Sequence, residues 1–200
     1  MTTKIGIIGN GNVGSALERG LKRTGNQVRS TGNDATSVRE VAGWANVVIL
    51  AVPFVVLGEV VKTAGSSLDG KTVVDVTNAL NPDMSLSLGF STSGAEELQK
   101  KAPNAHVVKS FNTIFAQHMD SGRLGDHTLT TLVAGDDAGA KQTVLELARG
   151  IGFDAVDAGP LKNARLIEPF GYLNIQLGYV LGLGTQIGFK LLHDKPAKSA

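Results

Sequence analysis

Apolar and polar positions follow two different periods along this chain. A short apolar run at residues 5–8 ends in glycine, and the apolar residues of 13–21 then recur at helical spacing. The first pattern is typical of a buried strand and the second of an amphipathic helix. The chain therefore opens with a strand, a tight turn and a helix.

The same alternation continues to about residue 160. Runs rich in Val and Ile are separated by segments with helical periodicity. Strands of this kind, linked by helices, predict a parallel sheet that is covered on both faces. We therefore expect an α/β fold with a doubly wound (Rossmann) sheet. Further strands are expected at 26–31, 46–53, 71–77, 106–111 and 128–135 and up to 157, with helices within 32–45, 55–63, 95–101 and 137–150.

The last part of the chain has a different pattern. Residues 169–189 carry no charge over about the length of a membrane span, but they include several amides and five glycines. Amides need partners in lipid, and glycine lowers helix propensity, so a helix buried against protein fits better. We expect a nucleotide-binding domain at 1–160 and a helical region at 161–200 that packs on it and forms a homodimer interface.

One long loop interrupts the alternation. Residues 81–94 are rich in Ser and Gly and have no periodicity. Loops of this length in a compact domain are either disordered or part of a site lid, and both interpretations stay open.

The balance of charge restricts the partners. The chain has 19 basic and 18 acidic residues, which are scattered along it, so neither nucleic acid nor a membrane surface is an expected partner. It has no cysteine, which excludes disulfides and thiolate chemistry and fits a cytoplasmic location. The four histidines have no metal-ligand spacing, and no metal is expected.

Three glycines occupy the first turn with the spacing Gly9-x-Gly11-x-x-Gly14. In a dinucleotide site these glycines make the tight turn, admit the pyrophosphate and let the helix pack closely on the strand. The backbone N–H groups at the start of the helix would then hold the phosphates. The alternative is a purely structural turn. The predicted cofactor contacts here are Gly9, Asn10, Gly11, Asn12 and Val13.

In an open parallel sheet, ligands lie beyond the carboxyl ends of the strands. Small and amide-bearing residues occupy these ends, without a carboxylate pair, a Ser/His/Asp set or a lysine base. Hydride transfer between flat rings needs alignment more than acid or base chemistry, so it fits this set. Asn78 and Asn112 could instead only cap helices or hold loops. The candidate residues are Thr31, Gly32, Asn33, Ala51, Val52, Pro53, Asn78, Asn112, Thr113, Ala134 and Gly135.

The end of the second strand bears on the choice between NAD and NADP. NAD sites usually place a carboxylate there, but this chain has Thr31-Gly32-Asn33. That sequence favours the 2′-phosphate of NADP. No arginine is present to grip it, and Asp34 is one residue away, so NAD stays possible.

Five segments resemble the F420-dependent NADP oxidoreductases, whose partner is a deazaflavin coenzyme. They are "IGIIGNGNVGSAL", "AVPF", "VVKSFNTI", "VAGDD" and "DAGPLKNARLIEP". The resemblance implies that 9–13 hold the pyrophosphate, that 51–53 border the cofactor, and that Asn112 and Thr113 flank the nicotinamide. It also implies an acceptor pocket lined by Ala134, Gly135 and, on the last helix, Ile187 and Gly188. Where the family has Ser-Arg for the 2′-phosphate, this chain has Gly32-Asn33.

The favoured function is hydride transfer between NADP(H) and a planar acceptor, either coenzyme F420 or a flavin. One alternative is an NAD(P)-dependent reductase of a carbonyl or imine. Another is a non-catalytic protein that senses NADP(H). The sequence alone leaves the acceptor open.

Overall fold

A seven-stranded sheet forms the centre of the molecule. The computed structural model describes residues 2–32, 34–192 and 194. Within them the strands lie in the order β2-β1-β3-β4-β5-β8-β9. These strands are β1 (Lys4–Ile8), β2 (Gln27–Thr31), β3 (Val47–Leu50), β4 (Thr72–Asp75), β5 (His106–Lys109), β8 (Thr130–Gly135) and β9 (Asp154–Asp157).

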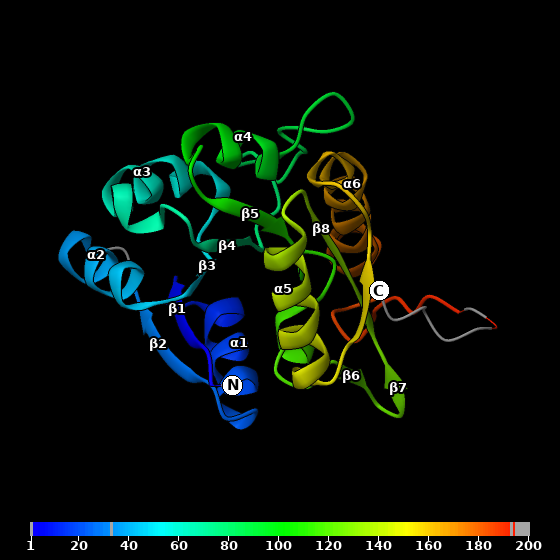
Figure 1. The fold of residues 1–200 in the computed structure, drawn as a ribbon. Helices are drawn as coiled ribbons and strands as arrows, with labels where there is room; N and C mark the ends of the chain where they lie inside the picture. The colour runs from blue at the N-terminus through cyan, green and yellow to red at the C-terminus, as the bar shows by residue number, and fades with distance from the viewer. Residues whose placement is uncertain (1, 33, 193, 195–200) are drawn as a thin grey trace.

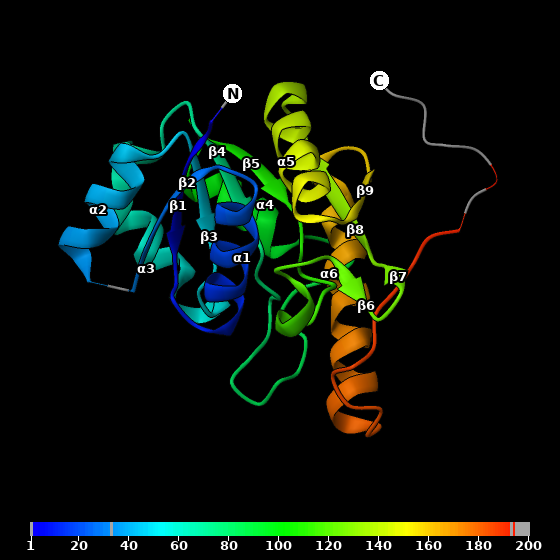
Figure 2. The same ribbon diagram turned by 90° about the horizontal axis from the view of Figure 1, so that it is seen from below.

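Helices cover both faces of this sheet (Figures 1 and 2). α1 and α5 pack on one face, and α2, α3 and α4 pack on the other. α6 follows β9 and continues as a π-helical turn, and a small hairpin of β6 and β7 precedes β8. These elements are α1 (Asn12–Arg23), α2 (Ala35–Trp44), α3 (Phe54–Ala64), α4 (Gly94–Lys101), α5 (Ala138–Ile151), α6 (Ala164–Ile175), the π-turn Gln176–Val180, β6 (Arg123–Leu124) and β7 (His127–Thr128). Short 3₁₀ turns lie at Gly65–Leu68, Ala116–His118 and Leu161–Asn163.

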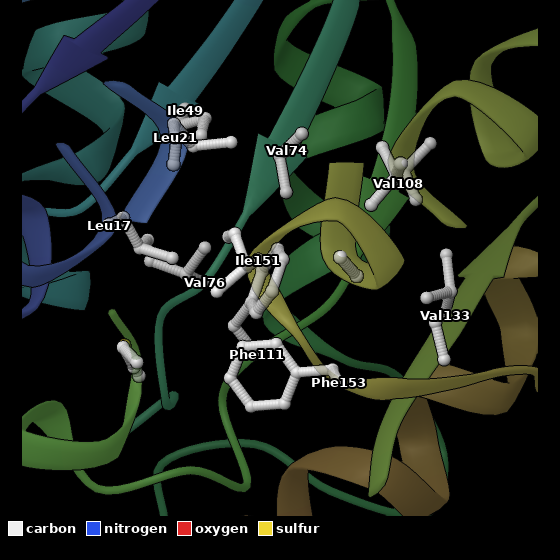
Figure 3. Close-up of a cluster of buried hydrophobic side chains, with 14 of the residues drawn as sticks. Leu17, Leu21, Ile49, Val74, Val76, Val108, Phe111, Val133, Ile151 and Phe153 are labelled. Atoms are coloured by element: carbon white, nitrogen blue, oxygen red, sulfur yellow. The ribbon is translucent and has the colours of Figure 1, made fainter. Parts of the chain in front are cut away.

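Alternate residues of the central strands supply two separate cores. Val74 and Val108 are buried with α1 and α5 in the cluster of Figure 3, whereas Val73 and Val107 are buried with the helices of the opposite face. This period of two explains the near-continuous Val and Ile runs, since both faces of each strand are covered. The doubly wound α/β fold is confirmed.

The sheet is not parallel throughout. β5 and β8 pair antiparallel, with Lys109 opposite Ala134 and Val108 opposite Gly135. β8 therefore runs in the opposite direction to β5, and its last two residues lie level with the last two residues of β5. The expectation that this strand is parallel to β5 is wrong, whereas a role of Ala134 and Gly135 in an acceptor pocket stays a prediction.

The apolar stretch near the C-terminus is not one helix. The helical structure ends at Val180, where Gly182 and Gly184 adopt left-handed φ values of 75° and 72°. Glycine takes this conformation without a steric penalty, so the two residues end the helix. Across the part of the chain that the structure describes, no helix combines the length and hydropathy needed to cross a membrane.

Candidate functional site

The three glycines after β1 have different surroundings. A Cβ added to Gly9, whose φ is 114°, would overlap the carbonyl oxygen of Ala51, and one added to Gly14 would overlap the carbonyl oxygen of Gly9. At Gly11 an added Cβ would meet no atom within 4 Å. The outer two glycines are required for packing of the turn, whereas Gly11 leaves open space.

The N-terminus of α1 faces this space without a capping side chain. Gly11 occupies the N-cap position, and the first turn has no acidic residue. In contrast, Asp34, Ser93 and Asp137 cap α2, α4 and α5 through their side chains. An uncapped helix N-terminus has free N–H groups and a positive partial charge, both of which favour a phosphate.

A polar hollow lies beside the start of α1. Its volume is about 270 Å³, and it separates the first turns of α1 from the 3₁₀ turn Ala116–His118. Asn12, the residue after Gly11, lines this hollow, so the hollow adjoins the N-terminus of α1. The residues that line the hollow are Asn12, Ser15, Arg19, Ala116 and Gln117.

Neighbouring strand ends meet at the glycine turn. Gly9 N donates to Thr31 O at 2.8 Å, and Ala51 N donates to Ile8 O at 2.8 Å. The Asn10 side chain lies beside Gly32. The structure thus brings together three predicted groups at one edge, namely 9–13, Thr31 with Gly32, and 51–53. Asn33 lies outside the described residues.

Asp34 is engaged with its own helix. Its carboxylate accepts a hydrogen bond from Ser37 N at 2.8 Å, and hydrogen bonds from Ser37 lower the pKa of this carboxyl below its ordinary value. The carboxylate therefore stays ionised as the N-cap of α2. In this position it does not take the place of the ribose-binding carboxylate of NAD sites.

Asn78 and Asn112 form a reciprocal pair at the ends of β4 and β5. Asn112 Nδ2 donates to Asn78 Oδ1 at 3.0 Å, and Asn78 Nδ2 donates to Asn112 O at 3.1 Å. Asn112 Nδ2 also donates to Ile167 O of α6, while Thr113 O accepts from Asn174 Nδ2. Asn112 is only 4% exposed and Thr113 only 2%. Their contacts to α6 account for their burial, and direct contact with a nicotinamide stays a prediction.

A buried charged cluster, which was not predicted from the sequence, lies close to this pair. Lys109, Asp75 and Glu168 are all 0% exposed, and Lys109 Nζ lies 3.0 Å from Asp75 Oδ2 and 3.1 Å from Glu168 Oε1. Burial would lower the pKa of Lys109, but the two carboxylates raise it above its ordinary value. A lysine in the run "VVKSF", next to an aspartate that ends "VVD" in the adjacent strand, was the available signal.

The residues expected in an acceptor pocket are not brought together. Ala134 and Gly135 are buried in the sheet, where they pair with Lys109 and Val108 of β5. Ile187 and Gly188 lie beyond the last helix in an irregular segment, where a Cβ on Gly188 would lie 2.7 Å from the Leu129 side chain. The expectation that these two residues belong to a helix is wrong, because Gly182 and Gly184 end it first.

Metal-binding side chains do not cluster in the described residues, which contain no group of three or more His, Cys, Asp or Glu placed to hold an ion.

Known proteins are similar to this chain over the glycine turn. Residues 4–79 match the family described as "NADP oxidoreductase coenzyme F420-dependent". The F420-dependent NADP reductase of Methanocaldococcus jannaschii is 33% identical over 146 residues, covering 70% of this chain and 65% of that protein. The resemblance to the F420-dependent NADP oxidoreductases is confirmed. The matched residues 4–79 include the whole glycine turn and the ends of β2, β3 and β4.

Two further relatives extend the family match along the chain. A crystal structure from Arthrobacter sp. FB24, of a protein proposed to be an F420-dependent NADP reductase, has a TM-score of 0.87 and 28% identity, and the match covers 96% of this chain and 100% of that chain. Metalloreductase STEAP3 of Rattus norvegicus is 33% identical over 178 residues. The match covers 82% of this chain but only 36% of STEAP3. This chain therefore corresponds to about a third of that larger relative.

Proposed function

We propose that this protein binds NADP(H) at the carboxyl edge of the sheet and transfers a hydride between the nicotinamide and a planar acceptor. The acceptor is coenzyme F420 or a flavin. The diphosphate lies at Gly11 and the N-terminus of α1, the adenosine half extends toward Thr31 and Gly32, and the nicotinamide half extends toward 51–53 and Asn78.

The observation that carries this proposal is the difference between the glycines. An added Cβ at Gly9 or Gly14 would overlap backbone atoms, whereas Gly11 faces open space in front of uncapped N–H groups. A purely structural turn would need only the close packing at Gly9 and Gly14. The open space at Gly11 is what the close approach of a diphosphate to the backbone requires.

The residues at the carboxyl edge of the sheet suit a planar acceptor. Transfer between two flat rings needs close alignment and exclusion of water, which small residues and fixed amides can provide. The named relatives share this nucleotide-binding part, but their names differ on the acceptor side, since one is an F420-dependent reductase and another a metalloreductase. Because these names differ, both planar acceptors, F420 and a flavin, are kept in the proposal.

The acceptor test uses the purified chain, NADPH and separate acceptors. F420, FMN and a panel of carbonyls and imines are added in turn, and the loss of nicotinamide absorbance is followed. We expect turnover with F420 or FMN and none with the carbonyls and imines. Turnover restricted to a carbonyl or imine would establish the alternative reductase, and NADPH binding without any turnover would favour the sensor.

A homodimer is proposed as the working form. The end of α6 and the segment after it expose large apolar side chains, including Leu181 at 67% and Leu183 at 60%. Each large side chain of this kind gains about 1.5–3 kcal/mol when it is fully buried, so a second copy would stabilise this surface. A boundary between a nucleotide-binding domain at 1–160 and an interface region at 161–200 stays a prediction, as does the cytoplasmic location. The exclusion of nucleic acid and membrane partners is equally a prediction.

A further inference from the structure

The buried triad fixes the backbone at the end of β4. Lys109 Nζ contacts the carboxylates of Asp75 and Glu168 and donates a hydrogen bond to Thr77 O. Asp75 Oδ1 accepts from Thr77 N at 2.8 Å. Both backbone hydrogen-bonding groups of Thr77 are therefore held by the triad. An ammonium has three protons, and here each has an acceptor.

The third member of the triad comes from α6 and also holds α4. Glu168 Oε2 accepts from Gly94 N at 2.8 Å, and Glu168 Oε1 accepts from Ala95 N at 3.1 Å. These two N–H groups belong to the first turn of α4, whose positive end favours a carboxylate. Glu168 thus connects two helices to the end of the sheet.

The fixed turn continues directly into the asparagine pair. Asn78 follows Thr77 and bonds reciprocally with Asn112. One turn beyond Glu168, Gly171 packs on this pair so closely that a Cβ there would lie 2.6 Å from Asn112 Nδ2 and 2.7 Å from Asn78 Oδ1. Thr77 Oγ1 is buried and has no hydrogen-bond partner among the described residues. Hydrogen bonds to the triad thus hold the backbone of the turn, while the Thr77 hydroxyl lacks a partner among the described residues.

We propose that Lys109, Asp75 and Glu168 are positioning residues, which hold Thr77 and Asn78 at the nicotinamide end of the cofactor. This inference rests on the proposed function. β4 lies next to β3 and two strands from the glycine turn of β1, so its carboxyl end lies toward the nicotinamide half of a dinucleotide whose phosphates sit at Gly11. In this proposal the triad positions the nicotinamide ring, whereas the N-terminus of α1 binds the phosphates.

Glu168→Gln is the principal test variant. It removes one carboxylate and leaves Lys109 and Asp75 as a neutral pair, so no unpaired buried charge remains. The glutamine amide places an NH₂ group, which cannot accept a hydrogen bond, against either Lys109 or the N-terminus of α4. The Glu168 carboxylate accepted hydrogen bonds at both places, so the turn at Thr77 should shift. Asp75→Asn perturbs the same turn from the sheet side. Glu96→Gln is the matched control, because it breaks the Arg165–Glu96 pair between α6 and α4 without contact to the triad.

Each variant is titrated with NADPH and with 2′,5′-ADP, which has only the adenosine half. We expect Glu168→Gln and Asp75→Asn to bind 2′,5′-ADP like the parent, to change the fluorescence of bound dihydronicotinamide, and to lower kcat by about 10²-fold with whichever acceptor is active. The Glu96→Gln control should retain the parent's fluorescence and kcat.

Two results would contradict the proposal, and a third would contradict the proposed function on which it rests. If folded Glu168→Gln and Asp75→Asn both keep the parent's fluorescence and turnover, the triad does not position the ring. If both variants lose 2′,5′-ADP binding together with the native circular dichroism, the triad is only structural. If the parent itself does not bind NADPH, the proposed function fails before this inference is reached.

Discussion

A β-carbon on Gly14 would overlap the carbonyl oxygen of Gly9, so α1 can lie this close to the end of β1 only with glycine at position 14. At Gly11, three residues earlier, an added β-carbon would have no atom within 4 Å. The Gly11 φ of −71° and ψ of −169° are open to any residue. One motif therefore combines a packing requirement with an unfilled space.

This contrast predicts opposite phenotypes for two substitutions. Gly14→Ala should lower the free energy of unfolding by about 1–3 kcal/mol, because overpacking forces the backbone apart. Gly11→Val should leave stability unchanged and weaken NADPH at least about tenfold, since one hydrogen bond to a charged group contributes about 1.5–3 kcal/mol. Thermal unfolding and calorimetric titration measure the two effects.

Gly43→Val is the control, because this exposed glycine of α2 lies far from the turn in sequence and has only Ser67 Oγ, at 3.9 Å, near an added Cβ. It should bind NADPH like the parent. Unchanged NADPH affinity in a folded Gly11→Val protein would show that the space at Gly11 is not the diphosphate site.

Asp34 should limit the preference for NADP. Its ionised carboxylate caps α2 beside the strand end where the 2′-phosphate is proposed. Asp34→Asn keeps a good N-cap and removes the negative charge next to the proposed 2′-phosphate, so NADPH should bind a few-fold tighter. The affinity for NADH should not change.

Calorimetric titration of parent and variant with both nucleotides decides this point. The parent should bind NADPH more tightly than NADH by a modest ratio. A parent that prefers NADH, together with weaker NADH binding in Asp34→Asn, would mean that Asp34 leaves the cap to hold the ribose.

Much of this edge was predictable because its signals are local. The glycine spacing, the apolar run before it and the helical period after it all lie within about twenty residues. Strand identity was equally local, since Val73, Val74, Val107 and Val108 are buried on alternating faces. The order of elements and the fold class follow from such patterns.

Features that depend on distant contacts were missed. The direction of β8 depends on the hairpin of β6 and β7 and on pairing with β5, and no local pattern encodes it. The end of the last helix depends on Gly182 and Gly184 taking left-handed conformations, although glycine also occurs within α6. The triad joins Asp75, Lys109 and Glu168 across three elements, and only tertiary structure brings them within hydrogen-bonding distance.

The Glu96–Arg165 pair should give stability a defined dependence on pH. Arg165 binds the carboxylate through two nitrogens at 2.7 and 2.9 Å, and this hydrogen bonding lowers the pKa of Glu96 below 4.5. A depressed folded pKa contributes stability that is present above pH 4.5 and is lost as the pH falls through the folded value. Glu96→Gln should therefore unfold about 1 kcal/mol more easily at neutral pH, with a difference that shrinks in acid.

Urea unfolding of parent and Glu96→Gln across acid and neutral pH measures this difference. A gap between the two proteins that stays constant, or grows toward low pH, would contradict the assigned role of the pair.

The exposed apolar surface after α6 should hold the dimer together. Leu181→Asp places a charge on a side chain that is 67% exposed, so the folded monomer is not disturbed but a buried interface would be. Light scattering at micromolar concentration should give a dimer for the parent and a monomer for this variant. Val55→Asp, at a 64% exposed position on α3, should stay dimeric. A parent that is monomeric would remove the homodimer from the account.

The central claim is direct hydride transfer from a nicotinamide bound at this edge, and isotope transfer measures it most directly. NADPH deuterated at its transferable position is mixed with the protein and F420, and the reduced deazaflavin is analysed by mass spectrometry. Carbon-bound deuterium does not exchange with water, so the account predicts one deuterium in the reduced acceptor with the parent and slowed transfer with Gly11→Val. Reduced F420 without the label, or no reduction of F420 or of a flavin, would contradict it.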